Sequence, residues 1–263
     1  MGFPLTSDDL LQPIMIRAAL SLVTFVVATL LGSVIAVSSA IFDRTGETVM
    51  AIARVWSRVV LGAPGVKLNV ELAGKLDPQR PYVFMANHAS MIDIWAVFVG
   101  VPLSFRFIAK KQLSYIPLFG WAMGAGRFIF IDRQNAVAAR RSIDEAARRI
   151  KAGQSVVIFP EGTRTRDGRL GSFKKGGFHL AIDSGAAIVP MAIHGSGQLM
   201  PPGSPLIRAG QVRLQIGEPI STAGLGPADR DRTLKLVHAR IAEMLGEPPP
   251  PVEQAGASVN HPQ

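Results

Sequence analysis

The sequence has 263 residues, of which 48% are hydrophobic, and this length suffices for one full core plus a membrane element. It carries 28 Lys and Arg against 19 Asp and Glu, and the formal net charge of +9 favours anionic partners: nucleic acid, an anionic membrane face or phosphate-rich substrates. The absence of cysteine excludes a disulfide framework, a thiolate nucleophile and a cysteine-ligated metal.

The first predicted element is a long hydrophobic helix. Residues 18–42 contain no charge and are rich in Val, Leu, Ala and Ile. A run of this length can span the hydrocarbon core of a bilayer, whereas a buried helix of a soluble domain is rarely so long. Basic residues follow the run, beginning with Arg44 and Arg54, and they favour the C-terminal side as cytoplasmic.

A second helix is predicted at residues 47–61, after a turn signal at residues 43–46. Two adjacent helices of this kind can also lie as a hairpin in one leaflet. The sequence therefore leaves a spanning helix and a leaflet hairpin as alternatives for an anchor within residues 1–64.

Strands and helices then alternate, which predicts one α/β domain over residues 65–246. Residues 105–121 mix aromatic and basic side chains, as in a membrane headgroup boundary or a core segment with a basic rim. The proline-rich residues 247–263 are predicted to be a disordered tail. The predicted strands are residues 66–72, 82–85, 128–131, 155–159, 187–193 and 212–216; residues 92–99 are helical or buried, and the predicted helices are residues 135–152 and 234–245.

His88 and Asp93 form the first candidate site. The strand at residues 82–85 delivers His88 to its C-terminal end, a common place for catalytic residues in α/β folds. Ser90 and Asp93 have the spacing of a helix capping box, so Asp93 is interpreted either as a cap or as the partner of His88. In the second interpretation Asp93 fixes the imidazole tautomer, and His88 takes a proton from an attacking hydroxyl. Both interpretations are compatible with one another.

The nucleophile is predicted to be a hydroxyl of the substrate. The chain contains no Gly-x-Ser-x-Gly nucleophile elbow and no cysteine, which disfavours an acyl-enzyme. No histidine pair has a zinc-binding spacing such as His-Glu-x-x-His. We therefore expect neither a metal nor a cofactor.

The second candidate site is the segment from Phe159 to Arg164, directly after a predicted strand. Gly162 lets the backbone approach a ligand closely, and the guanidinium of Arg164 fits phosphate oxygens. The alternative is a surface turn with solvated arginines. The segment is not a Walker A loop, because the pattern of that loop is absent.

With these blocks in order, the chain resembles the 1-acylglycerol-3-phosphate acyltransferases of the glycerolipid acyltransferase superfamily. The resemblance covers roughly residues 65–220. It rests on residues 87–93 (Asn-His-x4-Asp), 126–133, 159–164 (Phe-Pro-Glu-Gly-Thr-Arg) and 188–191.

The resemblance implies an α/β domain with a central mixed sheet flanked by helices, plus an N-terminal hydrophobic helix or two-helix membrane anchor. It implies transfer of a fatty acyl group from acyl-CoA or acyl carrier protein to the sn-2 hydroxyl of lysophosphatidic acid, which gives phosphatidic acid. The expected location is the cytoplasmic membrane, with the catalytic domain on the cytoplasmic side and in contact with membrane lipids.

Carried over by position, the resemblance makes His88 the general base and Asp93 its partner. It assigns the acceptor phosphate to Arg133, Glu161, Gly162, Thr163 and Arg164, with Lys110 as an additional basic contact.

Other functions stay open at this point. The acceptor could be another lyso-lipid, although Arg164 favours one that carries a phosphate. A lipid hydrolase or transacylase could use the same dyad, and a non-catalytic membrane-bound lipid-binding module would need neither His88 nor Asp93. A nucleic-acid-binding protein is disfavoured, because a basic tract and interleaved stacking aromatics are absent.

Overall fold

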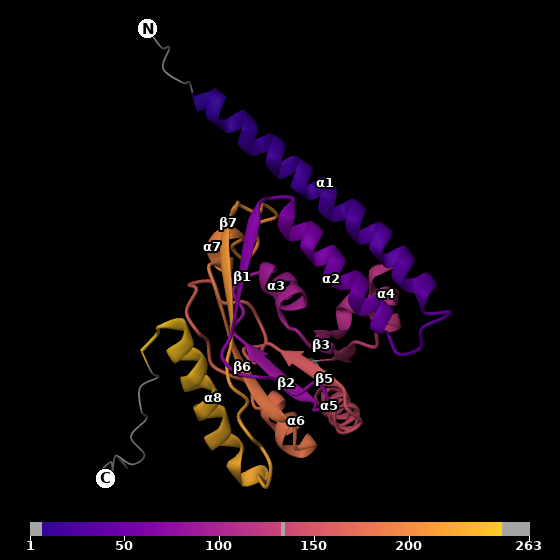
Figure 1. The fold of residues 1–263 in the computed structure, drawn as a ribbon, viewed down its shortest axis with the longest axis vertical. Helices are drawn as coiled ribbons and strands as arrows, with labels where there is room; N and C mark the ends of the chain where they lie inside the picture. Colours follow the sequence, from indigo (N-terminus) through magenta and orange to yellow (C-terminus); the bar gives the residue numbers. More distant parts are fainter. Residues whose placement is uncertain (1–6, 133–134, 249–263) are drawn as a thin grey trace, which may run out of the picture.

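The computed structural model describes residues 7–132 and 135–248, and Figure 1 shows how they are arranged. A seven-stranded sheet has the order β1-β7-β6-β2-β5-β3-β4. Its strands pair in parallel, except that β6 and β7 are antiparallel. The expected mixed sheet flanked by helices is thereby confirmed. The strands are β1 (Val66–Leu72), β2 (Tyr82–Ala86), β3 (Phe105–Lys110), β4 (Ile129–Ile131), β5 (Ser155–Ile158), β6 (Ala187–His194) and β7 (Gly210–Ile216).

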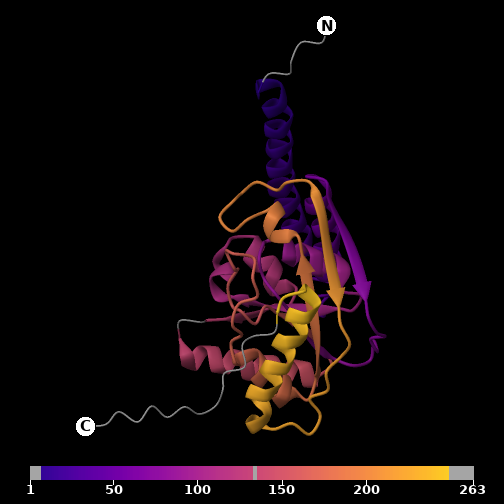
Figure 2. The ribbon, with the colours of Figure 1, turned by 90° about the vertical axis from the view of Figure 1, so that its left-hand side faces the viewer.

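The helices lie on both faces of the sheet. Side chains of α2, α3 and α4 form a core with one face, and side chains of α5, α6 and α8 form a second core with the other. Figure 2 shows α8 lying against the sheet, away from α1. The helices are α1 (Ser7–Ser39), α2 (Glu47–Gly62), α3 (Ile92–Gly100), α4 (Phe119–Ala125), α5 (Ala136–Lys151), α6 (Gly176–Ser184), α7 (Ser196–Leu199) and α8 (Arg230–Leu245), with short 3-10 turns η1 (Lys111–Tyr115) and η2 (Pro227–Asp229).

Strand β2 shows why the sheet can be covered twice. Tyr82, Phe84 and Ala86 belong to one core, and Val83 and Met85 belong to the other. Successive side chains of a strand point to opposite faces, so a strand covered on both sides is apolar throughout. This continuous apolar pattern is the one from which the strand was predicted.

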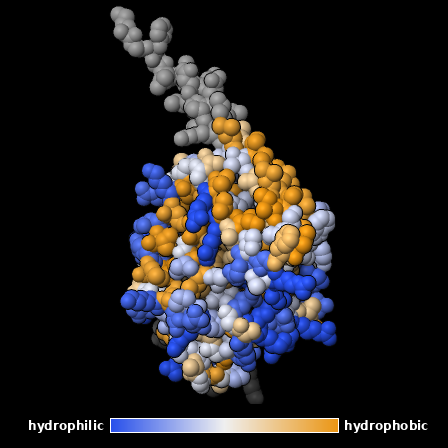
Figure 3. Space-filling model, turned by 45° about the vertical axis from the view of Figure 1, so that its right-hand side comes forward, coloured by the Kyte–Doolittle hydropathy of each residue, from blue (hydrophilic) through white to orange (hydrophobic). Residues whose placement is uncertain are grey.

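The N-terminal part is a helical hairpin made of α1 and α2. Helix α1 is 33 residues long and begins at Ser7, well before the uncharged run that predicted it. Residues Ala18–Ser39 are long and apolar enough to cross a membrane. Much of this helix exposes large apolar side chains, including Leu30, Leu31 and Val34. Figure 3 shows hydrophobic residues gathered at the end of the molecule that carries the hairpin.

Asp43 organises the turn between these two helices. Its carboxylate accepts hydrogen bonds from the backbone N–H groups of Thr45, Gly46 and Thr48, and from the Thr45 hydroxyl. The hydrogen bonds from Thr45 and Thr48 hold the pKa of Asp43 well below its usual range. A carboxylate that satisfies the free N–H groups of a helix start stabilises that start.

Strand β3 and the helices α4, α6 and α7 were not predicted from the sequence. Strand β3 lies between β5 and β4 inside the sheet, and Phe105 and Phe107 are buried, so this part of residues 105–121 is core rather than membrane boundary. The predicted tail falls largely on residues 249–263, which lie outside the described residues.

Candidate active site

His88 and Asp93 are in contact, as predicted. His88 Nδ1 lies 2.8 Å from Asp93 Oδ2. The same oxygen accepts hydrogen bonds from the backbone N–H groups of Ala89 at 2.8 Å and Ser90 at 2.7 Å. The side chain of Asp93 is fully buried, while that of His88 is 13% exposed. A carboxylate at Nδ1 favours the proton there, which leaves Nε2 free to accept one.

The capping interpretation of Asp93 also holds. Asp93 accepts from the N–H of Ser90, and Ser90 Oγ accepts from the N–H of Ile92 at 3.2 Å. One carboxylate therefore both accepts from the backbone just before α3, as in one half of a capping box, and orients the imidazole. The local sequence needs Asp at this position for two independent reasons.

Asn87 fixes the loop before His88. Its side-chain amide donates to the carbonyl of Ile193 at 3.0 Å and accepts from the N–H of Ile193 at 2.8 Å. The amide thus continues the pairing between β2 and β6 for one more position. Sequence reasoning missed this role, because its partner lies 106 residues away in the chain.

Glu161 was predicted to contact the acceptor phosphate, but its carboxylate instead binds backbone N–H groups. Its side chain is 5% exposed, Oε1 accepts from the backbone N–H of His88 at 2.7 Å, and Oε2 accepts from Gly171 at 2.9 Å. A Cβ on Gly171 would lie 2.7 Å from Oε2, so this approach requires glycine. The carboxylate holds two backbone segments together and does not line the pocket described below.

The pKa of Glu161 is raised to about 7. Burial is the main cause, and the nearby carboxylates of Asp93 and Glu247 act in the same direction. The two backbone N–H groups oppose the shift, since they stabilise the charged form.

The predicted phosphate loop also packs directly on His88. The ring of Phe159 stacks on the imidazole, with centroids 4.0 Å apart and planes inclined by 14°. The N–H of Thr165 donates to the carbonyl of His88 at 2.9 Å. The two sequence blocks therefore form one site, although they are about seventy residues apart in the chain.

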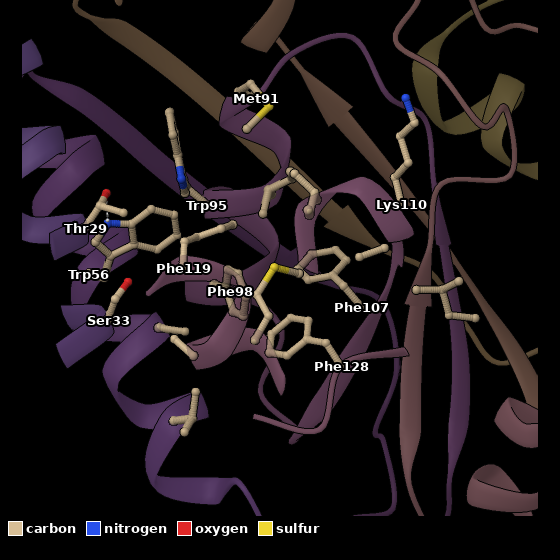
Figure 4. Close-up of a pocket in the computed structure, with 18 of the residues that line it drawn as sticks. Thr29, Ser33, Trp56, Met91, Trp95, Phe98, Phe107, Lys110, Phe119 and Phe128 are labelled. Carbon is tan, nitrogen blue, oxygen red and sulfur yellow. Dashed lines mark hydrogen bonds between the residues drawn. The ribbon is translucent and has the colours of Figure 1, made fainter. Parts of the chain in front are cut away.

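His88 opens into a pocket of about 400 Å3 between the sheet and the helical hairpin. Its walls are mainly apolar and come from α1, α2, α3 and α4 as well as β3, as Figure 4 shows. The lining also includes two basic side chains, Lys110 and Arg164, and the loop residues Gly162 and Thr163. A pocket of this size and character is typical of a site for an apolar ligand with a charged end.

Five predicted site residues thus line one pocket: His88, Lys110, Gly162, Thr163 and Arg164. Asp93 and Glu161 contact His88 but do not line the pocket. Arg133 lies outside the described residues. Arg166 and Arg169 are exposed and do not line the pocket. Over residues 7–132 and 135–248, no group of three His, Asp or Glu side chains could hold a metal ion.

Known proteins share this arrangement of elements and sequence. A family model described as Acyltransferase matches residues 67–194. A 1-acyl-sn-glycerol-3-phosphate acyltransferase of Pseudomonas aeruginosa is 31% identical over 214 residues, which cover 80% of this chain and 78% of that protein. The chain belongs to this acyltransferase family.

Other members of the family are similar over part of their length. The chloroplastic 1-acyl-sn-glycerol-3-phosphate acyltransferase LPAT1 of Arabidopsis thaliana is 38% identical over 171 residues, covering 64% of this chain. The chain spans about half the length of the chloroplastic relatives that it matches. The crystal structure of the acyltransferase PlsC from Thermotoga maritima superposes with a TM-score of 0.73 at 26% identity, covering 88% of this chain and 97% of that one.

Proposed function

We propose that this acyltransferase transfers a fatty acyl group from a thioester donor to the sn-2 hydroxyl of 1-acylglycerol-3-phosphate. One observation carries the proposal: an oriented imidazole lines a largely apolar pocket whose lining also includes the basic side chains of Lys110 and Arg164. A lysophosphatidic acid has the matching groups: a phosphate, a hydroxyl and a hydrocarbon chain. The relatives from Pseudomonas aeruginosa and Arabidopsis thaliana, both named as 1-acyl-sn-glycerol-3-phosphate acyltransferases, support this acceptor.

The chemistry follows from the tautomer that Asp93 favours. His88 Nε2 removes the proton of the sn-2 hydroxyl while the hydroxyl oxygen attacks the thioester carbonyl carbon. Buried Asp93 stabilises the imidazolium that forms. The carbon–sulfur bond then breaks, and His88 returns the proton to the leaving thiolate. The products are phosphatidic acid and a free thiol, without a covalent enzyme intermediate.

The acceptor phosphate is assigned to Arg164 and Lys110 of the pocket lining. A guanidinium offers two parallel donors to phosphate oxygens, and an ammonium adds charge. Gly162 has a φ of 76°, and this turn exposes the backbone of the loop to the pocket. Arg133 keeps its predicted part in this site as a proposal. Glu161 is assigned a positioning role in place of its predicted phosphate contact.

The helical hairpin is proposed to anchor the enzyme in the cytoplasmic membrane, with the catalytic domain on the cytoplasmic side. The exposed apolar side chains of α1 support insertion, and the basic residues after the hydrophobic run support this orientation. The pocket wall formed by α1 and α2 would then lie at the bilayer, where both lipid substrates partition.

The deciding experiment measures thiol release from palmitoyl-CoA by detergent-purified protein, with and without lysophosphatidic acid, and identifies the lipid product. We expect acceptor-dependent release with formation of phosphatidic acid. His88→Ala should lower the turnover number by at least ~10²–10⁴-fold. Release without acceptor would indicate a thioesterase instead, and a folded His88→Ala protein with most of its activity would contradict the mechanism. Acyl carrier protein donors and other lyso-lipids are assayed in parallel.

A further inference from the structure

Trp95 carries an unsatisfied hydrogen-bond donor within the wall of the pocket. It lies on α3, one turn after Met91, and only 2% of it is exposed. Its indole Nε1 is buried without a hydrogen-bond partner, although the residue lines the cavity. A buried indole N–H usually has an acceptor, because leaving it unpaired costs free energy. The lining therefore contains a donor whose acceptor the protein does not supply.

Trp56, a second tryptophan of the pocket lining, has a hydrogen-bond acceptor within the protein. Its indole Nε1 donates to Thr29 Oγ1 at 3.1 Å. The two indoles pack edge to face, with centroids 6.2 Å apart and planes at 84°. Both belong to the same apolar wall, yet only Trp56 is paired. The unpaired state of Trp95 is therefore particular to that side chain and is not general to the cluster.

Trp95 shares the pocket lining with His88 and Lys110. Lys110 and Trp95 stand on either side of Met91 (Figure 4). His88 and Trp95 come from one continuous segment, since His88 ends the loop after β2 and Trp95 lies in the α3 helix that follows. The same lining thus contains a cation, a base and an indole N–H.

An acylglycerol phosphate has three matching groups on three consecutive carbons: a phosphate, a hydroxyl and an ester. If the phosphate binds Lys110 and Arg164 and the hydroxyl binds His88, the ester carbonyl of the sn-1 chain is the remaining acceptor that an indole N–H of the same lining could meet. Other parts of the lining, including Phe98 and Phe119, are apolar and suit the hydrocarbon that follows the ester.

We infer that Trp95 determines acceptor specificity by donating its Nε1–H to the ester carbonyl oxygen of the sn-1 acyl chain. The inference rests on the proposed function for the identity of the lipid. It makes the site selective for acyl acceptors over ether-linked ones, in which that carbonyl is missing. The carbonyl oxygen of the donor's thioester is the alternative acceptor for the Trp95 Nε1–H. The experiment below distinguishes this oxygen from the ester carbonyl oxygen of the acceptor.

The kinetic test compares 1-palmitoyl lysophosphatidic acid with its 1-O-hexadecyl ether analogue, using wild type and Trp95→Phe. Wild type should prefer the ester in kcat/KM by about 5-fold, the effect of one neutral hydrogen bond. Trp95→Phe should bring this ratio close to one. Trp56→Phe, the matched control from the same wall, should retain the wild-type ratio. An equal loss for both acceptors in Trp95→Phe, as expected for contact with the thioester, would overturn the inference, and so would an unchanged ratio.

A second measurement needs neither turnover nor a folded variant. The chain has three tryptophans, so its nitrogen-15-labelled indole spectrum contains three Nε1–H signals. Without donor, the ester acceptor should shift the Trp95 signal downfield, and the ether analogue should not. Equal shifts with both lipids, or none with either, would overturn the inference. An ester-specific shift without any acyl transfer would instead reject the proposed function alone.

Discussion

Two carboxylates hold His88, one at its ring and one at its backbone. Asp93 contacts Nδ1 of the imidazole, and Glu161 accepts from the N–H of the same residue. Because both acids are buried, their geometry is maintained by hydrogen bonds rather than by solvent-exposed ion pairing. The loop at residues 159–164 therefore contributes to the position of His88 as well as to the lining of the pocket.

This arrangement predicts different kinetic signatures for neighbouring loop residues. Glu161→Gln places an NH2 group against one of two N–H donors and displaces His88. We expect kcat to fall by about 10–100-fold, with the acceptor KM nearly unchanged. Steady-state kinetics over both substrates measure the split. A raised acceptor KM at unchanged kcat would restore Glu161 to the phosphate site.

Arg164→Ala should show the opposite signature. Loss of the guanidinium removes a charge-assisted contact to the phosphate, so the acceptor KM should rise by about 10-fold or more. Arg166→Ala, an exposed arginine of the same loop that does not line the pocket, is the matched control and should behave as wild type. Equal behaviour of the two variants would remove Arg164 from the acceptor site.

Glu161 also predicts a pH dependence of stability. Burial raises its pKa from 4.5 to about 7, so the folded protein retains a proton that the unfolded chain releases. The contribution of Glu161 to the free energy of unfolding is therefore complete below about pH 4.5 and is lost as the pH rises through about 7. The Glu161→Gln variant has an amide in place of this carboxyl group and therefore has nothing to titrate there. Denaturant midpoints of wild type should thus decline relative to the variant between about pH 5 and pH 8, and parallel profiles would contradict the shift.

At the scale of elements, Arg106 connects the helical hairpin to the sheet. It is 1% exposed in β3, and its guanidinium donates to the carbonyl of Thr45 at 3.0 Å and to Glu47 at 2.9 Å. It also donates to Ser104 Oγ and to the carbonyl of Phe105. A single side chain therefore joins the turn before α2 to a central strand.

Arg106→Met should weaken this connection. The variant keeps an unbranched apolar stem in place of that of arginine but leaves the carbonyl of Thr45 without the guanidinium donor, and we expect a loss of about 2–4 kcal/mol in the free energy of unfolding. Limited proteolysis should also cut faster near residues 40–47. Arg80→Met, which removes an exposed arginine from a surface pair with Asp77, should change stability by less than about 1 kcal/mol. Equal effects of the two substitutions would argue against the connection.

Arg106 also explains a limit of the sequence prediction. Strands such as β2 and β6 were predictable, because unbroken apolar runs correspond to burial on both faces. In β3 an arginine interrupts the run, and its compensation comes from Thr45 and Glu47, about sixty residues earlier. The contact of His88 with Asp93 was predictable from local spacing. The backbone role of Glu161 and the unpaired indole of Trp95 were not, since both depend on segments joined only by folding.

At the scale of the whole molecule, the hairpin gives the protein an apolar end, and the surface away from the hairpin is largely polar (Figure 3). The side chains of α1 at Leu30, Leu31 and Val34 are exposed without protein cover. Such a surface on a helix of this length is stable in contact with lipid hydrocarbon.

The natural lack of cysteine makes insertion simple to measure. In membrane vesicles, Leu31→Cys should resist a water-soluble maleimide until detergent is added. Val137→Cys, an exposed position on α5, should react at once and serves as the control. Equal labelling of both positions before detergent would contradict the membrane anchor.

The pairing of β1 with β7 governs the order of assembly during synthesis. Glu71 of β1 lies opposite Gln215 of β7, 144 residues later, and β1 forms one edge of the sheet (Figure 2). While the ribosome is still producing the middle of the domain, the hairpin and β1 exist without the strand that β1 will join. Non-local pairing of this kind is slow, because a long loop must close before the contacts form. If the hairpin is the membrane anchor proposed above, it has time to reach the bilayer before the sheet is complete, and the domain would finish folding beside that membrane.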